Sequence, residues 1–267
     1  MKLGISSHSF GWAAGAVTYE IKNKMTAYDL LDIAYKYGIK VVQIADNIPL
    51  HLLSEDMLQV LKILAKEKNI EIELGLKGLT RDSLNKYIQL CEFLDCKLLR
   101  VVTDSIGYEP TLKEIISILM EVEPIIASKN IIIAIENHDR LKCKELSYII
   151  ERVNSSYIGI CLDTANSIIA SEGVEYVQTI LNPYILNVHS KDYKIKRLPC
   201  LMGFTVEGCP AGDGDVDIPK ILKSITSNVN VILEMWTTPE DSVEKTIRKE
   251  RAWVEKSINY LREFIPL

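Results

Sequence analysis

Four residues with metal-ligand side chains share one local context in the second half of the chain. Each ends a short apolar run: IAIE ends at Glu136, GICLD at Asp163, LNVH at His189 and VILE at Glu234. Runs of this kind are typical of strands that are buried on both faces of a parallel sheet. We therefore expect two glutamates, one aspartate and one histidine to come from consecutive strands and to meet at one edge of the sheet.

Each of the four residues has an alternative interpretation when it is taken alone. Glu136 could be a solvated loop carboxylate, and Asp163 could cap the helix that follows it. His189 could be a hydrogen-bonded polar residue, and Glu234 could pair with an arginine or lysine. The repetition of the pattern at four successive strand ends favours a single shared site.

Three carboxylates and one imidazole form a harder donor set than the thiolate-rich sets of structural zinc. We expect one divalent ion, Mn²⁺ first, with Mg²⁺, Co²⁺ and Zn²⁺ as alternatives. Such an ion would offset the repulsion between the carboxylates and polarise a carbonyl or hydroxyl group bound to it.

The elements that must position these residues alternate along the whole chain. The candidate strands cover residues 2–6, 40–45, 70–75, 98–102, 131–136, 158–163, 185–189 and 229–235. Each is followed by a segment with an apolar period near 3.6, and start signals such as Thr26 with Asp29, Ser54 and Thr80 precede several of these helices. Eight such units, at about 33 residues each, favour a closed (β/α)8 TIM barrel of the α/β class over an open sheet. No linker divides the chain, so we expect one domain over residues 1–267.

The longest irregular stretch covers residues 190–216 and is rich in glycine and proline. We expect a long functional loop here. Its AGDGD segment (211–215) could suggest a phosphate-binding loop, but no Lys-Ser/Thr pair follows, and its aspartates would repel phosphate. A turn into a helix at Asp217 is the preferred interpretation, and it favours an unphosphorylated substrate.

Composition sets the broad class of the protein. Hydrophobic residues make up 48% and charged residues 25%, which excludes a disordered, collagen-like or coiled-coil chain. The formal net charge of −5 repels phosphate backbones and anionic lipids, so we expect neither nucleic acid nor a membrane as partner. The polar residues 6–9 make the N-terminus a poor secretion signal, and the six cysteines have no C-x-x-C spacing. We expect buried free thiols and a cytoplasmic protein.

The strand-end motifs resemble those of the xylose isomerase-like superfamily of TIM barrels, which contains sugar isomerases, ketose 3-epimerases and inosose dehydratases. The resemblance rests on IENH (135–138), LDTAN (162–166), NVHSKD (187–192), AGDGDVDIPKIL (211–222) and LEMW (233–236). It implies that the four strand-end residues bind one divalent metal ion. It also implies that Glu136 and Glu234 act as the acid/base pair of an isomerase or epimerase that works through an enediolate on an unphosphorylated sugar.

The resemblance also suggests residues that contact a sugar substrate. Lys191 matches an H-x-K-D pattern, and Arg197 resembles an arginine that follows the seventh strand in these enzymes, although either could be a surface charge. His8, Trp12 and His138 could line the pocket or serve only the local structure. Asn166 stands where several ketose epimerases have a histidine, which weakens the specific assignment as a ketose 3-epimerase.

Three other functions remain open at this point. A lyase or dehydratase acting on a keto-inositol or 3-keto-sugar would share the first proton abstraction and then expel a leaving group. A non-catalytic sugar-binding barrel would bind without proton exchange. The superfamily also includes three-zinc abasic-site endonucleases, but these need many more histidines than the four in this chain. Exterior helices of a barrel offer surfaces for a homo-oligomer.

Overall fold

Eight parallel strands close into a barrel in the computed structural model, which describes residues 1–15 and 21–265. Their order around the barrel is β1-β10-β7-β6-β5-β4-β3-β2, so each barrel strand lies beside the next one along the chain and the last closes on the first. The strands are β1 (Lys2–Ser6), β2 (Val41–Ile44), β3 (Glu71–Lys77), β4 (Leu98–Val102), β5 (Ile132–Glu136), β6 (Ile158–Asp163), β7 (Ile185–Ser190) and β10 (Asn230–Leu233). The predicted (β/α)8 barrel is therefore confirmed.

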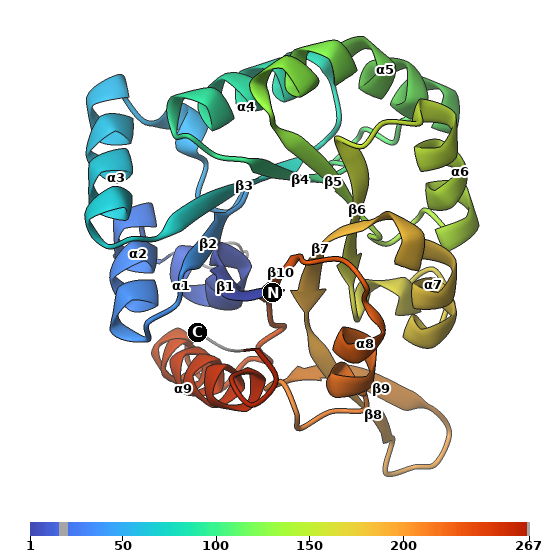
Figure 1. Ribbon diagram of the computed structural model, residues 1–267. Helices are drawn as coiled ribbons and strands as arrows, with labels where there is room; N and C mark the ends of the chain where they lie inside the picture. The colour runs from blue at the N-terminus through green and yellow to red at the C-terminus, as the bar shows by residue number, and fades with distance from the viewer. Residues whose placement is uncertain (16–20, 266–267) are drawn as a thin grey trace.

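Helices surround the barrel as an outer ring (Figure 1). They are α1 (Gly11–Ala14), α2 (Ala27–Lys36), α3 (Glu55–Glu67), α4 (Arg81–Phe93), α5 (Leu112–Lys129), α6 (Cys143–Val153), α7 (Val174–Leu181), α8 (Ile218–Ser224) and α9 (Val243–Leu261). Helix α2 begins where the sequence predicts, because Thr26 and Asp29 form a capping box. Its apolar face is fully buried, and Leu30, Leu31 and Ala34 are 0% exposed. Burial of such stripes between helix and strand forms the main core.

Residues 190–216 are not the long loop expected from the sequence. They contain an antiparallel hairpin, β8 (Asp192–Arg197) paired with β9 (Phe204–Cys209). The strands of this hairpin carry apolar and charged residues in alternation, as in YKIK (193–196), and lack the continuous apolar run of a buried strand. That alternation is the signal that could have predicted them.

A glycine-rich turn follows the hairpin and leads into α8, as predicted. Its backbone N–H groups at Gly212, Gly214 and Val216 donate hydrogen bonds of 2.9, 2.9 and 3.2 Å to the carboxylate of Asp192. A Cβ atom on Gly214 would lie 2.0 Å from Asp192 Oδ1, so this position requires glycine. The turn therefore binds an anion of its own chain, where the sequence raised the question of phosphate.

The cysteines are all free, and five of them are buried as expected. Cys200 is the exception, because it lies exposed in the connection between β8 and β9. No helix in the described part of the chain is both long enough and apolar enough to cross a bilayer.

Candidate active site

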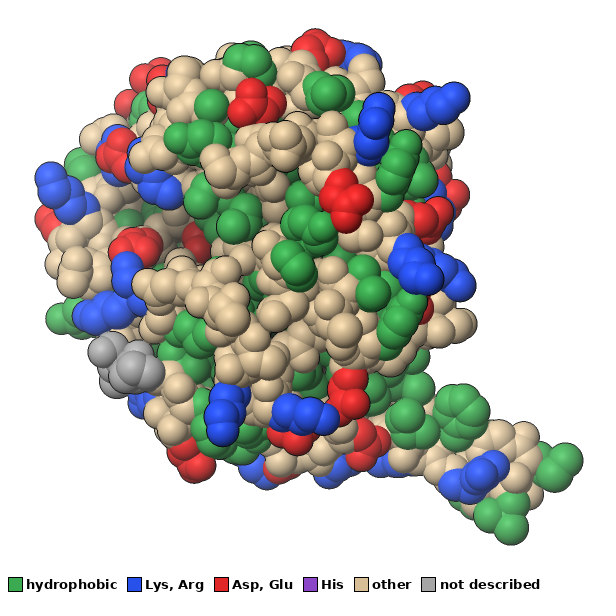
Figure 2. Space-filling model, turned by 45° about the vertical axis from the view of Figure 1, so that its right-hand side comes forward, with side chains coloured by type: hydrophobic (Ala, Val, Ile, Leu, Met, Phe, Trp, Pro, Cys, Tyr) green, Lys and Arg blue, Asp and Glu red, His purple; other side chains and the backbone are tan. Residues whose placement is uncertain are grey.

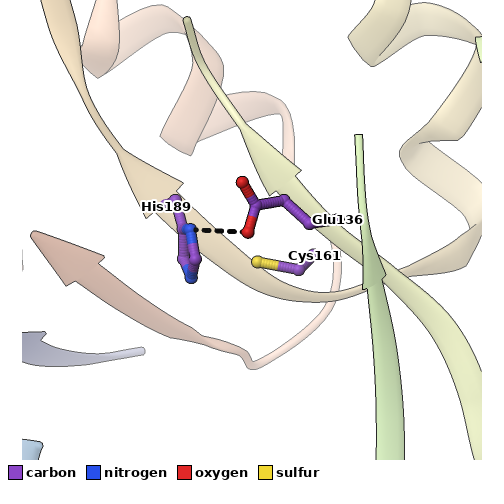
Figure 3. A group of neighbouring side chains, drawn as sticks. All are labelled: Glu136, Cys161 and His189. Carbon is purple, nitrogen blue, oxygen red and sulfur yellow. Dashed lines mark ion pairs between the residues drawn. The ribbon is translucent and has the colours of Figure 1, made fainter. Parts of the chain in front are cut away.

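The four strand-end residues meet at the carboxyl ends of β5, β6, β7 and β10. His189 Nδ1 lies 3.4 Å from Glu136 Oε2, 3.4 Å from Glu234 Oε2 and 3.8 Å from Asp163 Oδ2. All four side chains are buried, none more than 4% exposed. Figure 3 shows the imidazole of His189 and the carboxylate of Glu136 pointing toward one another from neighbouring parts of the barrel. Parallel strands deliver these residues to one rim because their carboxyl ends share one end of the barrel.

A hydrogen-bond relay inside the barrel orients His189. Its Nε2 lies 2.8 Å from Gln43 Oε1, and the Gln43 side-chain N–H donates to Glu73 Oε2 at 3.1 Å. Asn187 and Asn230 also donate to Glu73, at 3.1 and 2.7 Å. Since the amide nitrogen of Gln43 is committed to Glu73, its oxygen faces His189 and accepts a hydrogen bond from the Nε2–H group. The relay leaves Nδ1 of His189 directed at the three carboxylates.

Two buried cations balance the carboxylates. Lys191 Nζ lies 2.9 Å from Asp163 Oδ2 and 3.2 Å from Glu234 Oε2, and it stands 5.0 Å from the centre of the Trp236 ring. Arg100 Nε lies 3.2 Å from Glu136 Oε2. These ion pairs lie in the low-dielectric interior, where each charge depends strongly on its partners.

The electrostatics of the cluster follow from its burial and its paired charges. Burial alone would raise the pKa of Glu234, but the charges of His189 and Lys191 hold it well below its usual range. Burial would likewise lower the pKa of His189, and the carboxylates of Glu234 and Glu136 reverse this and raise it. The cluster thus favours an ionised Glu234 beside cationic partners.

The donor atoms fit a hard divalent ion. Asp163 Oδ2 and His189 Nδ1 are buried without a hydrogen bond, although charged groups stand nearby. One donor atom each of Asp163, His189 and Glu234 lies within 4.8 Å of the others. Glu136, Cys161 and His189 form a second such group, but burial and the neighbouring Glu136 raise the pKa of Cys161 well above its usual value. Sulfur is a soft donor, so the oxygen and nitrogen donors make the better set for a hard divalent ion.

A pocket of about 490 Å³ opens above the cluster. Its wall includes five of the six residues expected to contact substrate, namely His8, Trp12, His138, Asn166 and Lys191. The sixth, Arg197, is exposed at the end of β8 and does not line this pocket. Its predicted contact with substrate remains a prediction.

Polar contacts hold these wall residues in place. Asn166 Nδ2 donates to Glu136 Oε1 at 2.6 Å, and Asn166 Oδ1 accepts from Lys191 Nζ at 3.3 Å. The amide of Asn166 therefore links a candidate ligand to a buried cation, at the position where the sequence departs from the epimerase pattern.

The first strand and the loop after it provide the opposite wall. His8 Nε2 lies 3.2 Å from Asp46 Oδ1, and Trp12 Nε1 donates to Thr237 O at 2.8 Å. The backbone N–H groups of Trp12 and Ala13 donate to the carboxylate of Glu250, at 2.9 and 3.1 Å. Glu250 lies on α9 and also lines the pocket, so the last helix holds α1 in position.

Sequence reasoning missed several polar residues around the site, notably Arg100, Gln43 and Glu73. Arg100 and Gln43 each interrupt a strand that otherwise reads as apolar, in LLRVV and VVQI, and Glu73 lies in the alternating strand IEIELG. All three are buried, at 2%, 0% and 4% exposure. A charged or amide residue within a buried strand is the signal that could have found them, since such groups persist in a core only with partners.

Comparisons with known proteins agree with this fold. A family model described as "Xylose isomerase-like TIM barrel" matches residues 31–264. A curated relative, the 3-oxo-isoapionate decarboxylase of Pectobacterium atrosepticum, is 31% identical over 264 residues, which cover 98% of this chain and 95% of the relative. Two solved structures cover 100% of both chains: D-psicose 3-epimerase with D-tagatose from Clostridium cellulolyticum H10, at 15% identity and a TM-score of 0.73, and the IOLI protein with a bound zinc atom, at 19% identity and a TM-score of 0.69.

Proposed function

The chain belongs to the xylose isomerase-like TIM barrel family, and we propose that it is a divalent-metal-dependent lyase that decarboxylates an unphosphorylated 3-oxo sugar acid. The observation that carries the proposal is the engagement of both candidate bases by buried cations. Glu136 is held by Arg100 and Asn166, and Glu234 by Lys191 and Ser6. Epimerisation needs carboxylates that are free to take up and return a proton, whereas decarboxylation of a 3-oxo acid needs no base for its first step.

The metal would be held by Glu136, Asp163, His189 and Glu234. When bound, a divalent ion supplies a Lewis acid that polarises the ketone oxygen of the substrate. These residues suit that role because they present carboxylate oxygens and one imidazole nitrogen at a rim that is closed on its inner side by the relay through Gln43 and Glu73. The carboxylates that anchor the ion are the same groups that Lys191 and Arg100 neutralise.

The remaining chemistry falls to the wall of the pocket. Cleavage of the bond to the carboxyl group releases CO₂ and leaves its electron pair in an enediolate, which needs one proton on carbon. Lys191 Nζ faces both the pocket and the carboxylates of Asp163 and Glu234, so it is placed to donate that proton and recover it from solvent. The decarboxylase relative supports this outcome, because its alignment covers nearly the whole of this chain.

A second candidate is the sugar isomerase or epimerase implied by the strand-end motifs. One observation favours it: Glu136 ends β5 and Glu234 directly follows β10, two strands that are separated in the barrel by β6 and β7, and both side chains approach His189 at 3.4 Å. Two carboxylates that approach from different sides are what proton transfer between two faces of an enediolate requires.

Two assays on one preparation separate these candidates. Metal content is measured first, and the protein is then incubated in D₂O with 3-oxo sugar acids, ketoses, inososes and 3-keto-glycosides while NMR follows the products. Release of CO₂ with one deuterium incorporated per product supports the decarboxylase. Deuterium exchange or epimerisation of ketoses without CO₂ release supports the epimerase and overturns the primary proposal. The primary proposal is also overturned if the protein releases CO₂ equally well after all divalent metal has been removed.

A further inference from the structure

The β8–β9 hairpin projects from the barrel as an arm, defined here as residues 192–209 (Figure 1). Its two strands form a separate sheet of their own, and within the described part of the chain no third strand pairs with either edge. A two-stranded hairpin alone is marginally stable in water, and free strand edges favour association with another chain. The arm therefore has the form of an element that is completed by a partner.

Contacts with the glycine-rich turn and with the segment after β10 hold the base of the arm in one orientation relative to the barrel. Asp192 accepts the backbone hydrogen bonds of the glycine-rich turn, and Asp215 Oδ2 accepts from the N–H of Ile195 at 2.7 Å. Gly208 packs so closely on the backbone of Trp236 that a Cβ there would lie 2.0 Å from the Trp236 oxygen. A rigid base aims the outer half of the arm away from its own barrel.

The outer half of the arm carries large apolar side chains in solvent. The exposed fractions are 53% for Ile195, 71% for Leu201, 87% for Met202 and 64% for Phe204. Figure 2 shows hydrophobic and basic side chains on the projection at the lower right of the molecule. Several large apolar side chains exposed on one projecting element indicate a protein interface.

The charge of the arm, compared with that of the rest of the chain, indicates a second copy of this chain as the partner. The arm holds Lys194, Lys196 and Arg197 against Asp192 and Glu207, a formal +1 in a chain of net −5, so the rest of the chain carries −6. The arm of one molecule is therefore attracted to the body of another.

The loops at the pocket mouth offer the complementary surface. They include Asp104, which pairs with Arg140 at 2.7 Å, the acidic residues Glu109 and Asp139, and the exposed apolar residues Ile106, at 103%, and Ile169, at 61%. Ile169 and Asp139 line the pocket itself. Acidic and apolar groups thus stand together at the mouth, as cationic and apolar groups do on the arm.

We propose that the arm docks on a second copy of this chain and covers the mouth of that copy's pocket. This docking brings Arg197 of the partner subunit to the mouth of the pocket, although in its own subunit Arg197 lies outside the pocket. This assembly does not depend on which reaction the site performs, so it can be tested separately from the proposed function.

Sedimentation velocity tests the assembly. Wild-type protein at micromolar concentration should sediment as a dimer or larger symmetric oligomer, and Phe204→Glu or Met202→Glu should shift it toward monomer. Met120→Glu is the matched control, because Met120 is 53% exposed on α5, away from the arm. A monomeric wild-type protein, or arm variants that assemble as the wild type does, would overturn the proposal. Circular dichroism verifies that each variant is folded.

Crosslinking from Cys200 tests where the arm docks. This cysteine lies at the tip and is exposed while the other five are buried, so a benzophenone maleimide labels it selectively. An equimolar mixture of ¹⁴N and ¹⁵N protein is irradiated and digested. Peptides that join Cys200 of one isotope to residues 104–109, 139 or 169 of the other are expected. Crosslinks confined to one isotope, or directed to another face of the barrel, contradict docking at the mouth.

Discussion

Substitution of Gln43 by leucine should weaken metal binding although Gln43 is not a ligand. The side chain is 0% exposed, and its oxygen lies 2.8 Å from His189 Nε2. Leucine removes that acceptor, so nothing holds the proton on Nε2, and the tautomer with the proton on Nδ1 becomes accessible. A proton on Nδ1 occupies the position from which His189 would bind a metal ion.

The size of the effect follows from the burial of the relay. Loss of an orienting partner of a metal-binding histidine typically costs about 10- to 100-fold in affinity, or about 1.4–2.7 kcal/mol. The stability of the metal-free protein should fall by about 1–3 kcal/mol, because the imidazole N–H is left buried without an acceptor. Glu73 keeps Asn187 and Asn230 as donors, so the rest of the polar layer persists.

Isothermal titration of Mn²⁺ into metal-free protein measures the metal affinity, and urea unfolding without metal measures the stability of the metal-free protein. Val42→Ala is the control: Val42 is also 0% exposed, but adjacent residues of a strand point to opposite faces, so its side chain points away from His189. The control should lose stability and keep its Mn²⁺ affinity. If Gln43→Leu binds Mn²⁺ within twofold of the wild type, the relay does not orient the ligand.

Three further outcomes are expected. Asp163→Asn should lower Mn²⁺ affinity at least 10-fold in calorimetry while the circular dichroism spectrum stays unchanged, because an amide oxygen replaces the charged oxygen of a candidate ligand. Burial raises the pKa of Glu250 to about 7, although hydrogen bonds from Trp12 and Ala13 lower it. The folded state therefore holds the proton of Glu250 more tightly than the unfolded state does. The free energy of unfolding should fall by up to about 3 kcal/mol as the pH rises from about 4.5 through 7. Thermal unfolding across that range should show a smaller fall in Glu250→Gln, and equal slopes would contradict the assignment. Gly214→Ala should cost about 2–4 kcal/mol in urea unfolding, because its Cβ would displace the Asp192 carboxylate; an unchanged midpoint would show that the turn adapts.

The parts of the site that the sequence predicted are those that depend on local pattern and on one rule of topology. An apolar run indicates a buried strand, and in a parallel barrel the residue that ends the run must lie at the common rim. This is why the sequence alone is enough to bring Glu136, Asp163, His189 and Glu234 together. The rule needs no knowledge of which strands are neighbours.

The parts that the sequence did not predict depend on contacts between distant residues. Gln43 acts on His189 from a strand 146 positions earlier, and Asn230 reaches Glu73 across 157 positions. No local pattern encodes such pairs. The arm was missed for a different reason. The outer parts of its two strands, β8 and β9, are exposed to solvent, and their register is set by their own pairing and by the contacts of Asp192.

The buried charges also bear on the substrate. Glu136, Asp163 and Glu234 carry three formal negative charges, and Lys191 and Arg100 return two positive ones, so the group sums to −1 when His189 is neutral, the form in which an imidazole binds a metal ion. A divalent ion would change this to +1. Interior charge that is left unbalanced is costly, and an anionic substrate would relieve it where a neutral ketose would not. The same two cations that restrain the candidate bases therefore favour a sugar acid, and binding of a 3-oxo acid should strengthen when the metal is added by more than binding of the corresponding ketose.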